Sequence, residues 1–379
     1  MYLQKSITYI FFISVFLVSF YLFYHMSLNL TYQTNTFLSD YPSHIRNLIN
    51  IFHGDLQFPY PIWHYLVQKS SIFLPLDIIT SAAFVTASVV TIYAILIYKI
   101  IHYLLSDTTV QSSLLSTLIT LILLIVGPLD LPNYNMYYIL GQWSPNIWYS
   151  PTFVMLKPFA LLATFFIVKT LQNRSFKFLF ITVLAAILSV FAKPSFIIVF
   201  LPAILLFYLL RPIYLSKYNT LLISILFLST IGSILFQYSL LFSESNVHIL
   251  IDPYGVWSKY SPSIFLSLLL GLGFPLLYLL FYTQRVYKND YTLLSWIMTI
   301  ISITVAILFA ESGERYMHGN FFWSYATSLN LLYIFSLISF IKYFNWEESK
   351  TKIILLILVV QALLGLKYLI NIMQGGYAL

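Results

Sequence analysis

The composition of this 379-residue chain excludes a soluble globular enzyme. Hydrophobic residues make up 60% of it and charged residues only 8%, whereas about 25% of an ordinary soluble domain is charged. A soluble protein of this length could not bury so much apolar surface. The net charge of +7 is too dilute for a nucleic-acid-binding surface, so no nucleic acid is expected as a partner.

Eleven apolar segments approach the roughly 20 residues that a helix needs to cross a bilayer. In chain order they are Ile7–Tyr24, Ile78–Tyr98, Leu114–Leu129, Phe153–Val168, Phe176–Phe191, Ser195–Leu210, Tyr218–Leu241, Ile264–Phe281, Tyr291–Phe309, Phe321–Ile341 and Ile353–Ile370. The fifth and sixth are separated only by Lys193 and Pro194, so they are two thin spans or a broken pair. We therefore expect an all-α polytopic membrane protein with eleven transmembrane helices, forming a single domain over residues 1–379.

The distribution of Lys and Arg predicts how these spans are oriented. If the N-terminus is cytoplasmic, the inner segments hold 12 of the 19 basic residues and the outer segments hold seven. Because basic residues favour the cytoplasmic side, we expect a cytoplasmic N-terminus and an outer C-terminus. The outer loops are then 25–77, 128–152, 242–263 and 310–320. Short inner loops and the absence of cysteine favour a bacterial plasma (inner) membrane.

The first outer loop contains the segment Ser39-Asp40-Tyr41-Pro42-Ser43-His44, which begins a predicted amphipathic helix. Apolar residues follow at helical spacing, and Asp40 or Ser39 stands where an N-cap belongs. We expect this helix to lie on the membrane, with Asp40 and His44 on one face and Arg46 off that face. His64 would face the same outer cavity. Two interpretations stay open: Asp40 is a functional carboxylate, or it only caps the helix.

Ionisable groups also gather in the segment from Glu311 to Asn320. Glu311 and Arg315 are four residues apart, as are Glu314 and His318, so these groups form two local pairs or part of a functional site. Two lysines, Lys157 and Lys193, stand at outer helix ends. Each of them could snorkel to water, but together with Arg46 and Arg315 they are typical of a phosphate-binding cluster.

The loop from Gln142 to Thr152 is rich in Trp and Pro and leads into a span. Tryptophans at this position are typical of the aromatic belt at a membrane interface, which is the interpretation we favour for Trp143 and Trp148. Stacking against a carbohydrate is the functional alternative. The chain contains no nucleotide-binding loop, zinc-protease motif or nucleophile elbow.

This arrangement resembles the GT-C superfamily of integral-membrane glycosyltransferases, which use polyprenyl-phosphate-linked sugars. The resemblance rests on a cytoplasmic N-terminus, a first helix, and a long outer loop with an acid near its start, here Asp40 within Ser39–His44. Many members carry two near-adjacent acids there, whereas this chain has Asp40 with Asp55 fifteen positions on. The large soluble C-terminal domain of oligosaccharyltransferases is absent.

The resemblance implies a sugar transfer from a polyprenyl-phosphate-linked donor to a hydroxyl of a glycan or lipid acceptor. Asp40 would be the general base. Lys157, Lys193, Arg46 or Arg315 would hold the departing phosphate. The other polar candidates, His44, His64, Glu314 and His318, would orient the acceptor or phosphate, or ligate a divalent cation. Membrane lipid is the remaining partner.

Two other functions fit a protein with many spans and large outer loops. An O-antigen-type polysaccharide polymerase normally has arginine-rich outer loops, but only Arg46 and Arg315 lie outside here. A non-enzymatic flippase or transporter of lipid-linked sugars would need charges along a path through both leaflets. The predicted spans are almost uncharged, and the ionisable groups gather on one side, which favours a one-sided enzyme.

Overall fold

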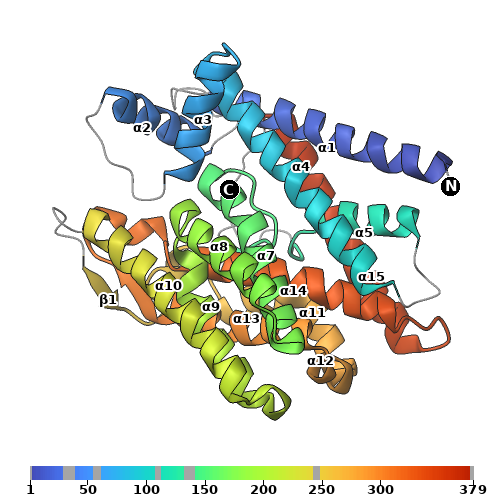
Figure 1. Cartoon of the computed structure of the whole chain (residues 1–379). Coiled ribbons are helices and arrows are strands. Elements are labelled where there is room, and N and C mark those ends of the chain that lie inside the picture. The colour runs from blue at the N-terminus through green and yellow to red at the C-terminus, as the bar shows by residue number, and fades with distance from the viewer. Residues whose placement is uncertain are drawn as a thin grey trace.

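The computed structural model describes residues 2–28, 39–53, 61–106, 112–131, 141–241 and 248–375, and these residues are mostly helical (Figure 1). The long helices are α1 (Tyr2–Leu28), α4 (Ile78–Leu104), α7 (Pro151–Asn173), α10 (Lys217–Leu241), α11 (Ile264–Phe281), α13 (Asp290–Leu308), α14 (Phe322–Lys342) and α15 (Ser349–Met373). The shorter elements are α2 (Tyr41–His53), α3 (Ile62–Phe73), α5 (Ser113–Ile125), α8 (Phe176–Ala192), α9 (Ser195–Leu210), α12 (Thr283–Lys288), three 3₁₀ turns, η1 (Pro212–Tyr214), η2 (Trp257–Lys259) and η3 (Gly313–His318), and two strands, β1 (Ile249–Ile251) and β2 (Phe309–Glu311).

Within the described ranges, eight helices are long and apolar enough to cross a membrane, namely α1, α4, α7, α10, α11, α13, α14 and α15. Several of them expose large apolar side chains. Ile10 and Leu17 of α1 are 62% and 60% exposed, and Leu356 and Leu363 of α15 are 61% and 60% exposed. Apolar faces of this kind fit hydrocarbon better than water. The chain is therefore an all-α polytopic membrane protein, as its composition predicts.

Each of the eleven predicted spans coincides with a helix, but α5, α8 and α9 have only 13, 17 and 16 residues. The helix α5 departs most from the prediction, because it ends at Ile125 instead of Leu129. The following chain is extended, and the amide of Gly127 donates to the carbonyl of Gln361 on α15 at 3.1 Å. Non-helical backbone is tolerated at this depth because the protein itself supplies the hydrogen bonds.

The loops predicted for the outer side of the membrane meet one another at one end of the helices. The strands β1 and β2 pair antiparallel, with Leu250 opposite Ala310, and so join the third and fourth outer loops. The indole nitrogen of Trp257 donates to the carbonyl of Gly141 at 2.9 Å, which joins the third loop to the second. This grouping agrees with the predicted topology.

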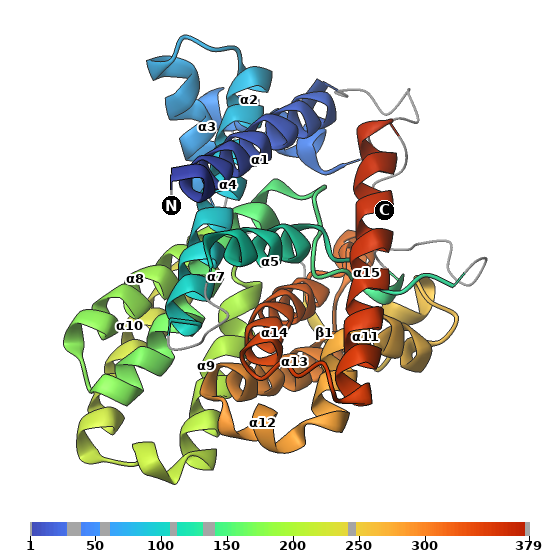
Figure 2. The same ribbon diagram turned by 90° about the vertical axis from the view of Figure 1, so that its right-hand side faces the viewer.

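The predicted inner segments meet at the opposite end. Arg211 forms an ion pair with Asp290 at 2.9 Å, and Arg285 forms one with Glu348 at 3.5 Å. In Figure 2, α12 lies beside the lower ends of α13 and α11, and α15 lies alongside α11. These contacts join predicted inner segments to one another, while the number of spans and the side that faces the cytoplasm stay predictions.

The loop from Gly141 to Ser150 lies inside the protein, and all ten of its residues are buried. Trp143 is 1% exposed and Trp148 is 7% exposed, so the predicted aromatic belt is wrong for both. The loop reaches between the helices because its polar groups find partners there. The side chain of Asn330, halfway along α14, donates to the carbonyl of Pro145 at 2.9 Å. The side chain of Asn146 donates to two carbonyls at the end of α5, at 2.8 and 2.9 Å.

The predicted helix after Asp40 is confirmed as α2, which lies beside α3 at one end of the molecule (Figure 1). Its apolar face is buried, with Tyr41, Ile45 and Leu48 at most 2% exposed, whereas Arg46 is exposed. The first outer loop contains a second helix, α3, beyond the one that the sequence predicts. It is anchored to α4 through the indole of Trp63, which donates to Thr86 at 3.0 Å.

Candidate active site

Asp40 is held at the start of α2 by backbone hydrogen bonds on both of its sides. Its amide donates to the carbonyl of Tyr149 in the buried loop at 2.9 Å, and its own carbonyl accepts from the amide of His44 at 3.0 Å. The second bond is the first turn of the helix. The carbonyl of Tyr149 therefore determines where α2 begins, and Asp40 is partly buried where the two loops meet.

The Asp40 carboxyl group lies in an environment that opposes its ionisation overall. Burial raises its pKa, while the ammonium of Lys193, the hydroxyl of Ser150 and His318 act in the opposite direction with smaller effect. Among the described residues, the ion pairs within 4.0 Å are Arg211–Asp290 and Arg285–Glu348, and Asp40 is in neither. This carboxylate is therefore more basic than usual and is not held by a close cation.

Lys193 follows the last residue of α8, where the chain turns into α9, and its side chain is buried between α7 and α14. Its ammonium lies 4.2 Å from the ring centroid of Trp323 and donates to the hydroxyl of Thr152 at 3.4 Å. Burial lowers the pKa of Lys193 to about 8, although Asp40 and Glu311 act to raise it. A buried ammonium beside a carboxylate, at the end of the helices where the predicted outer loops meet, is the candidate group for contacting a phosphate here.

The segment around Glu311 does not form the two ion pairs that its residue spacing allows. The residues after Ser312 form the 3₁₀ turn η3, in which residues four apart do not lie above one another. Accordingly, neither Glu311 with Arg315 nor Glu314 with His318 is among the ion pairs of the described residues. Glu311 instead accepts a hydrogen bond from the side chain of Asn320 at 2.6 Å, and its charge acts on Lys193.

His44 and His64 form a direct pair, with 3.2 Å between Nδ1 of His44 and Nε2 of His64. Burial lowers the pKa of His44 well below its usual value, and the neighbouring His64 and Lys193 lower it further. His44 is therefore neutral at pH 7. The neutral imidazole of His44 can orient a hydroxyl or a phosphate oxygen without adding charge.

The structure thus brings together five of the predicted site residues, Asp40, His44, His64, Lys193 and His318, which are linked by contact or by electrostatic interaction. Others lie apart from this group. Arg46 is exposed and donates to the hydroxyl of Ser43 at 3.2 Å, and Glu314 is exposed on η3, where Arg315 is partly buried.

Lys157 has surroundings of its own. Its ammonium donates to the side chain of Asn146 at 3.2 Å and faces the rings of Tyr93, Trp148 and Phe153 at 5.8, 5.1 and 5.2 Å. The side chain is 3% exposed, and no acidic side chain of the described residues pairs with it. Contacts with aromatic faces stabilise a buried cation without an anion. Lys157 therefore shares a buried loop with the site but is enclosed by rings.

The sequence pattern does not indicate Thr152 or Trp323 as parts of the site. Glu311 belongs to the segment for which the sequence leaves open two local pairs or part of a functional site. Trp323 stands at the start of α14, where a tryptophan is ordinarily interpreted as an interface anchor. No signal in the sequence connects these residues to Lys193.

The donor set does not favour a metal centre. Over the ranges that the structure describes, no three His, Cys, Asp or Glu side chains are grouped in a way that could hold a metal ion. Asp55, the second acid of the first outer loop, lies outside those ranges. The cation that faces Asp40 here is the ammonium of Lys193.

No protein-family model matches the chain, and a search of curated proteins finds no match beyond chance. The site consists of a carboxylate of raised pKa, a buried ammonium and a pair of imidazoles.

Proposed function

We propose that this protein is an integral-membrane glycosyltransferase of GT-C type, which moves a sugar from a polyprenyl-phosphate donor to an acceptor hydroxyl on the extracytoplasmic side. The observation that supports this proposal is that the Asp40 carboxylate and the Lys193 ammonium lie near enough at one end of the helices for the charge of each to act on the pKa of the other. A base and an anion-binding cation are the two groups that such a transfer needs.

In the proposed reaction the acceptor oxygen forms a bond to the anomeric carbon of the sugar. Asp40 takes the proton of the attacking hydroxyl, and the bond between the anomeric carbon and the phosphate oxygen breaks. The electron pair leaves with the polyprenyl phosphate, whose new charge is stabilised by Lys193. The raised pKa of Asp40 favours proton uptake in this step.

The remaining residues of the site have supporting roles in this mechanism. His318 lies near enough to Asp40 to act on its pKa and would orient an acceptor hydroxyl, and the His44–His64 pair supplies hydrogen-bonding groups. Thr152 and Trp323 position the ammonium of Lys193. The buried loop from Gly141 to Ser150 fixes Asp40 through the carbonyl of Tyr149.

The proposal includes the bacterial plasma membrane, a cytoplasmic N-terminus and an outer C-terminus. In this topology α1 is followed by an outer segment in which an acid directly precedes an amphipathic helix, as in the GT-C superfamily. The short helices α5, α8 and α9 complete the eleven spans. Because α8 and α9 have only 17 and 16 residues and meet at Lys193, this lysine would lie a few ångströms below the outer surface, within the outer leaflet.

The experiment that tests the proposal uses the purified full chain in lipid vesicles that contain radiolabelled polyprenyl-phosphate-linked sugars from membranes of the source cells. We expect free polyprenyl phosphate and a labelled acceptor to appear together with the wild-type protein, and neither with Asp40→Asn. A labelled donor that crosses the bilayer without being consumed would instead indicate a flippase. Consumption of donor by Asp40→Asn at the wild-type rate would remove Asp40 from the mechanism.

A further inference from the structure

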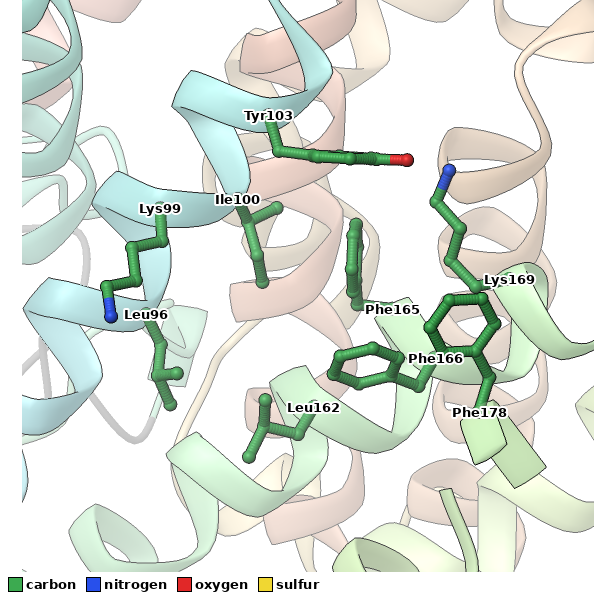
Figure 3. A pocket seen from close by; sticks show the side chains of 9 residues that line it. All are labelled: Leu96, Lys99, Ile100, Tyr103, Leu162, Phe165, Phe166, Lys169 and Phe178. Atoms are coloured by element: carbon green, nitrogen blue, oxygen red, sulfur yellow. The ribbon is translucent and has the colours of Figure 1, made fainter. Parts of the chain in front are cut away.

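A second candidate site lies at the end of the helices opposite Asp40. A cavity of about 360 Å³ opens between α4, α7 and α8 (Figure 3). Its walls are apolar and include Leu162, Phe165, Phe166 and Phe178. The helix α7 connects the two places, because Thr152 on it lies beside Lys193 and Lys169 on it lies at the cavity. These two residues are 17 positions apart, which is about 25 Å along the helix. The cavity is therefore distinct from the candidate active site.

Two lysines stand at the rim of this cavity. Figure 3 shows Lys99 of α4 and Lys169 of α7 on opposite sides of the aromatic walls, with the ammonium of Lys169 beside the hydroxyl end of Tyr103. The ammonium lies 4.5 Å from the centroid of the Tyr103 ring. Among the described residues, no carboxylate lines the cavity and neither lysine belongs to an ion pair.

The nearby carboxylate of Asp290 is already bound by other groups. It pairs with Arg211 at 2.9 Å and accepts from the side chain of Gln172 at 3.1 Å and from Tyr214. Lys169 therefore has no ion-pair partner among the carboxylates that the structure describes. The rim thus offers an ammonium and a phenol hydroxyl above an apolar cavity, a combination that is complementary to an anionic lipid.

The two lysines of the cavity lie at the depth in the membrane where a lipid phosphate is found. Lys99 stands five residues before the end of α4, and Lys169 stands four residues before the end of α7. At a rise of about 1.5 Å per residue, both lie about 6–8 Å from a helix end, where the phosphates of a leaflet meet its hydrocarbon. Basic pockets between helices at this level bind anionic headgroups.

We propose that this cavity binds an anionic phospholipid, with one acyl chain against the aromatic walls and the phosphate between Lys169 and the Tyr103 hydroxyl. Lys99 attracts the same headgroup from the other rim. The site is independent of the sugar transfer proposed above, because it needs neither Asp40 nor Lys193. The competing interpretation is that both lysines only snorkel to water, in which case the headgroup charge is irrelevant.

The test measures binding of phosphatidylglycerol and phosphatidylcholine to the delipidated full-length protein by native mass spectrometry. We expect wild-type protein to prefer phosphatidylglycerol, and the double variant Lys99→Met/Lys169→Met to bind it more weakly by on the order of thirtyfold. Methionine keeps an apolar stem, so the fold should survive. Lys288→Met is the matched control, because Lys288 is an exposed lysine at the same end of the helices, outside the cavity.

A third variant, Leu162→Trp, fills the cavity without changing its charge and should also weaken phosphatidylglycerol binding. Inorganic phosphate at millimolar concentration should not displace the lipid, because it lacks the acyl chain. Equal binding of the two lipids by the wild-type protein would overturn the proposal. So would an unchanged affinity of the double variant, or full displacement of the lipid by inorganic phosphate.

Discussion

The amide of Asp40 lies 2.9 Å from the carbonyl oxygen of Tyr149, and this hydrogen bond joins the start of α2 to a loop that is wholly buried. The carboxylate is thus held by backbone from another part of the chain. Lys193 reaches the same place from the junction of α8 and α9. The two groups that matter most to the proposed transfer are therefore positioned by three separate segments.

Asp40→Asn should lower the rate of sugar transfer by about 10²- to 10⁴-fold, the usual contribution of a general base. It should not lower the thermal unfolding midpoint. The pKa of Asp40 is higher in the folded protein than in the unfolded chain, so the ionised carboxylate costs stability at neutral pH and the neutral amide removes that cost. Transfer and thermal unfolding of the purified variant measure both effects.

Asp77→Ala is the matched control, because Asp77 also precedes a helix. Its carboxylate accepts from the amide of Thr80 at 2.9 Å and caps α4. We expect this variant to lose about 1 kcal/mol of stability, typical of a lost cap, and to keep its transfer rate. If Asp40→Asn behaved like Asp77→Ala, Asp40 would be a cap only.

Lys193→Met should weaken binding of a polyprenyl-phosphate donor by at least about tenfold, since one charge-assisted contact to phosphate is lost. Lys157→Met is the same substitution at another buried lysine. Its ammonium is enclosed by aromatic rings and bonded to Asn146, so donor affinity should change little. Calorimetric titration with the donor compares the two variants. Equal loss of affinity in both would show that the lysines act together.

Donor binding should weaken at alkaline pH because Lys193 must be protonated to hold phosphate. Burial lowers the pKa of Lys193 to about 8, so affinity should be constant at lower pH and fall as the pH rises through about 8. The phosphodiester of the donor stays ionised throughout. Lys193→Arg should move this decline to higher pH, because arginine remains charged. An affinity that is flat up to pH 10 in the wild-type protein would contradict the role of Lys193.

Gly365→Ala should destabilise the protein strongly. A Cβ atom at Gly365 of α15 would lie 1.7 Å from the carbonyl oxygen of Ile125 and 2.6 Å from the amide of Gly127, where backbone cannot give way easily. We expect a loss of about 1–3 kcal/mol, as for overpacked interiors. Gly232→Ala, on α10, meets nothing within 4 Å and should not lower the unfolding midpoint. Two variants of equal stability would mean that α15 does not pack against the chain after α5.

The predicted orientation can be checked by labelling single cysteines, which is direct because the chain contains no cysteine. A cysteine at Ser43 on α2 should react with an impermeant reagent added outside intact cells, whereas one at Ser216, before α10, should react only after permeabilisation. The opposite pattern would place Asp40 in the cytoplasm and exclude an extracytoplasmic transfer.

Much of the fold follows from the sequence because lipid imposes a simple length and polarity rule on each span. All eleven segments are helices, and α2 starts at the residue after Asp40, as capping and spacing predict. The loop from Gly141 to Ser150 was misjudged, because Trp and Pro have the same local signature in an interface belt and in a buried loop. Only the partners of its polar groups, such as Asn330 on α14, distinguish the two.

The sequence predicts which residue types form the candidate site, but only partly which of these residues lie close together in the fold. Asp40, His44 and His64 lie close in sequence, and a helix places the first two on one face. The approach of Lys193 to Trp323 depends on how α8, α9 and α14 pack, and no local pattern encodes it. Of the two alternatives for the segment from Glu311 to Asn320, the local pairs are not observed, because Glu311 lies on β2 and the residues after Ser312 form a 3₁₀ turn.

The most direct measurement is the release of polyprenyl phosphate by the reconstituted full-length protein, followed in parallel for the wild type, Asp40→Asn and Lys193→Met, with donor lipids from membranes of the source cells. We predict acceptor-dependent release by the wild type, none by Asp40→Asn, and release by Lys193→Met only at raised donor concentration. Wild-type protein that releases no more polyprenyl phosphate than Asp40→Asn would contradict the assignment of this protein as a glycosyltransferase.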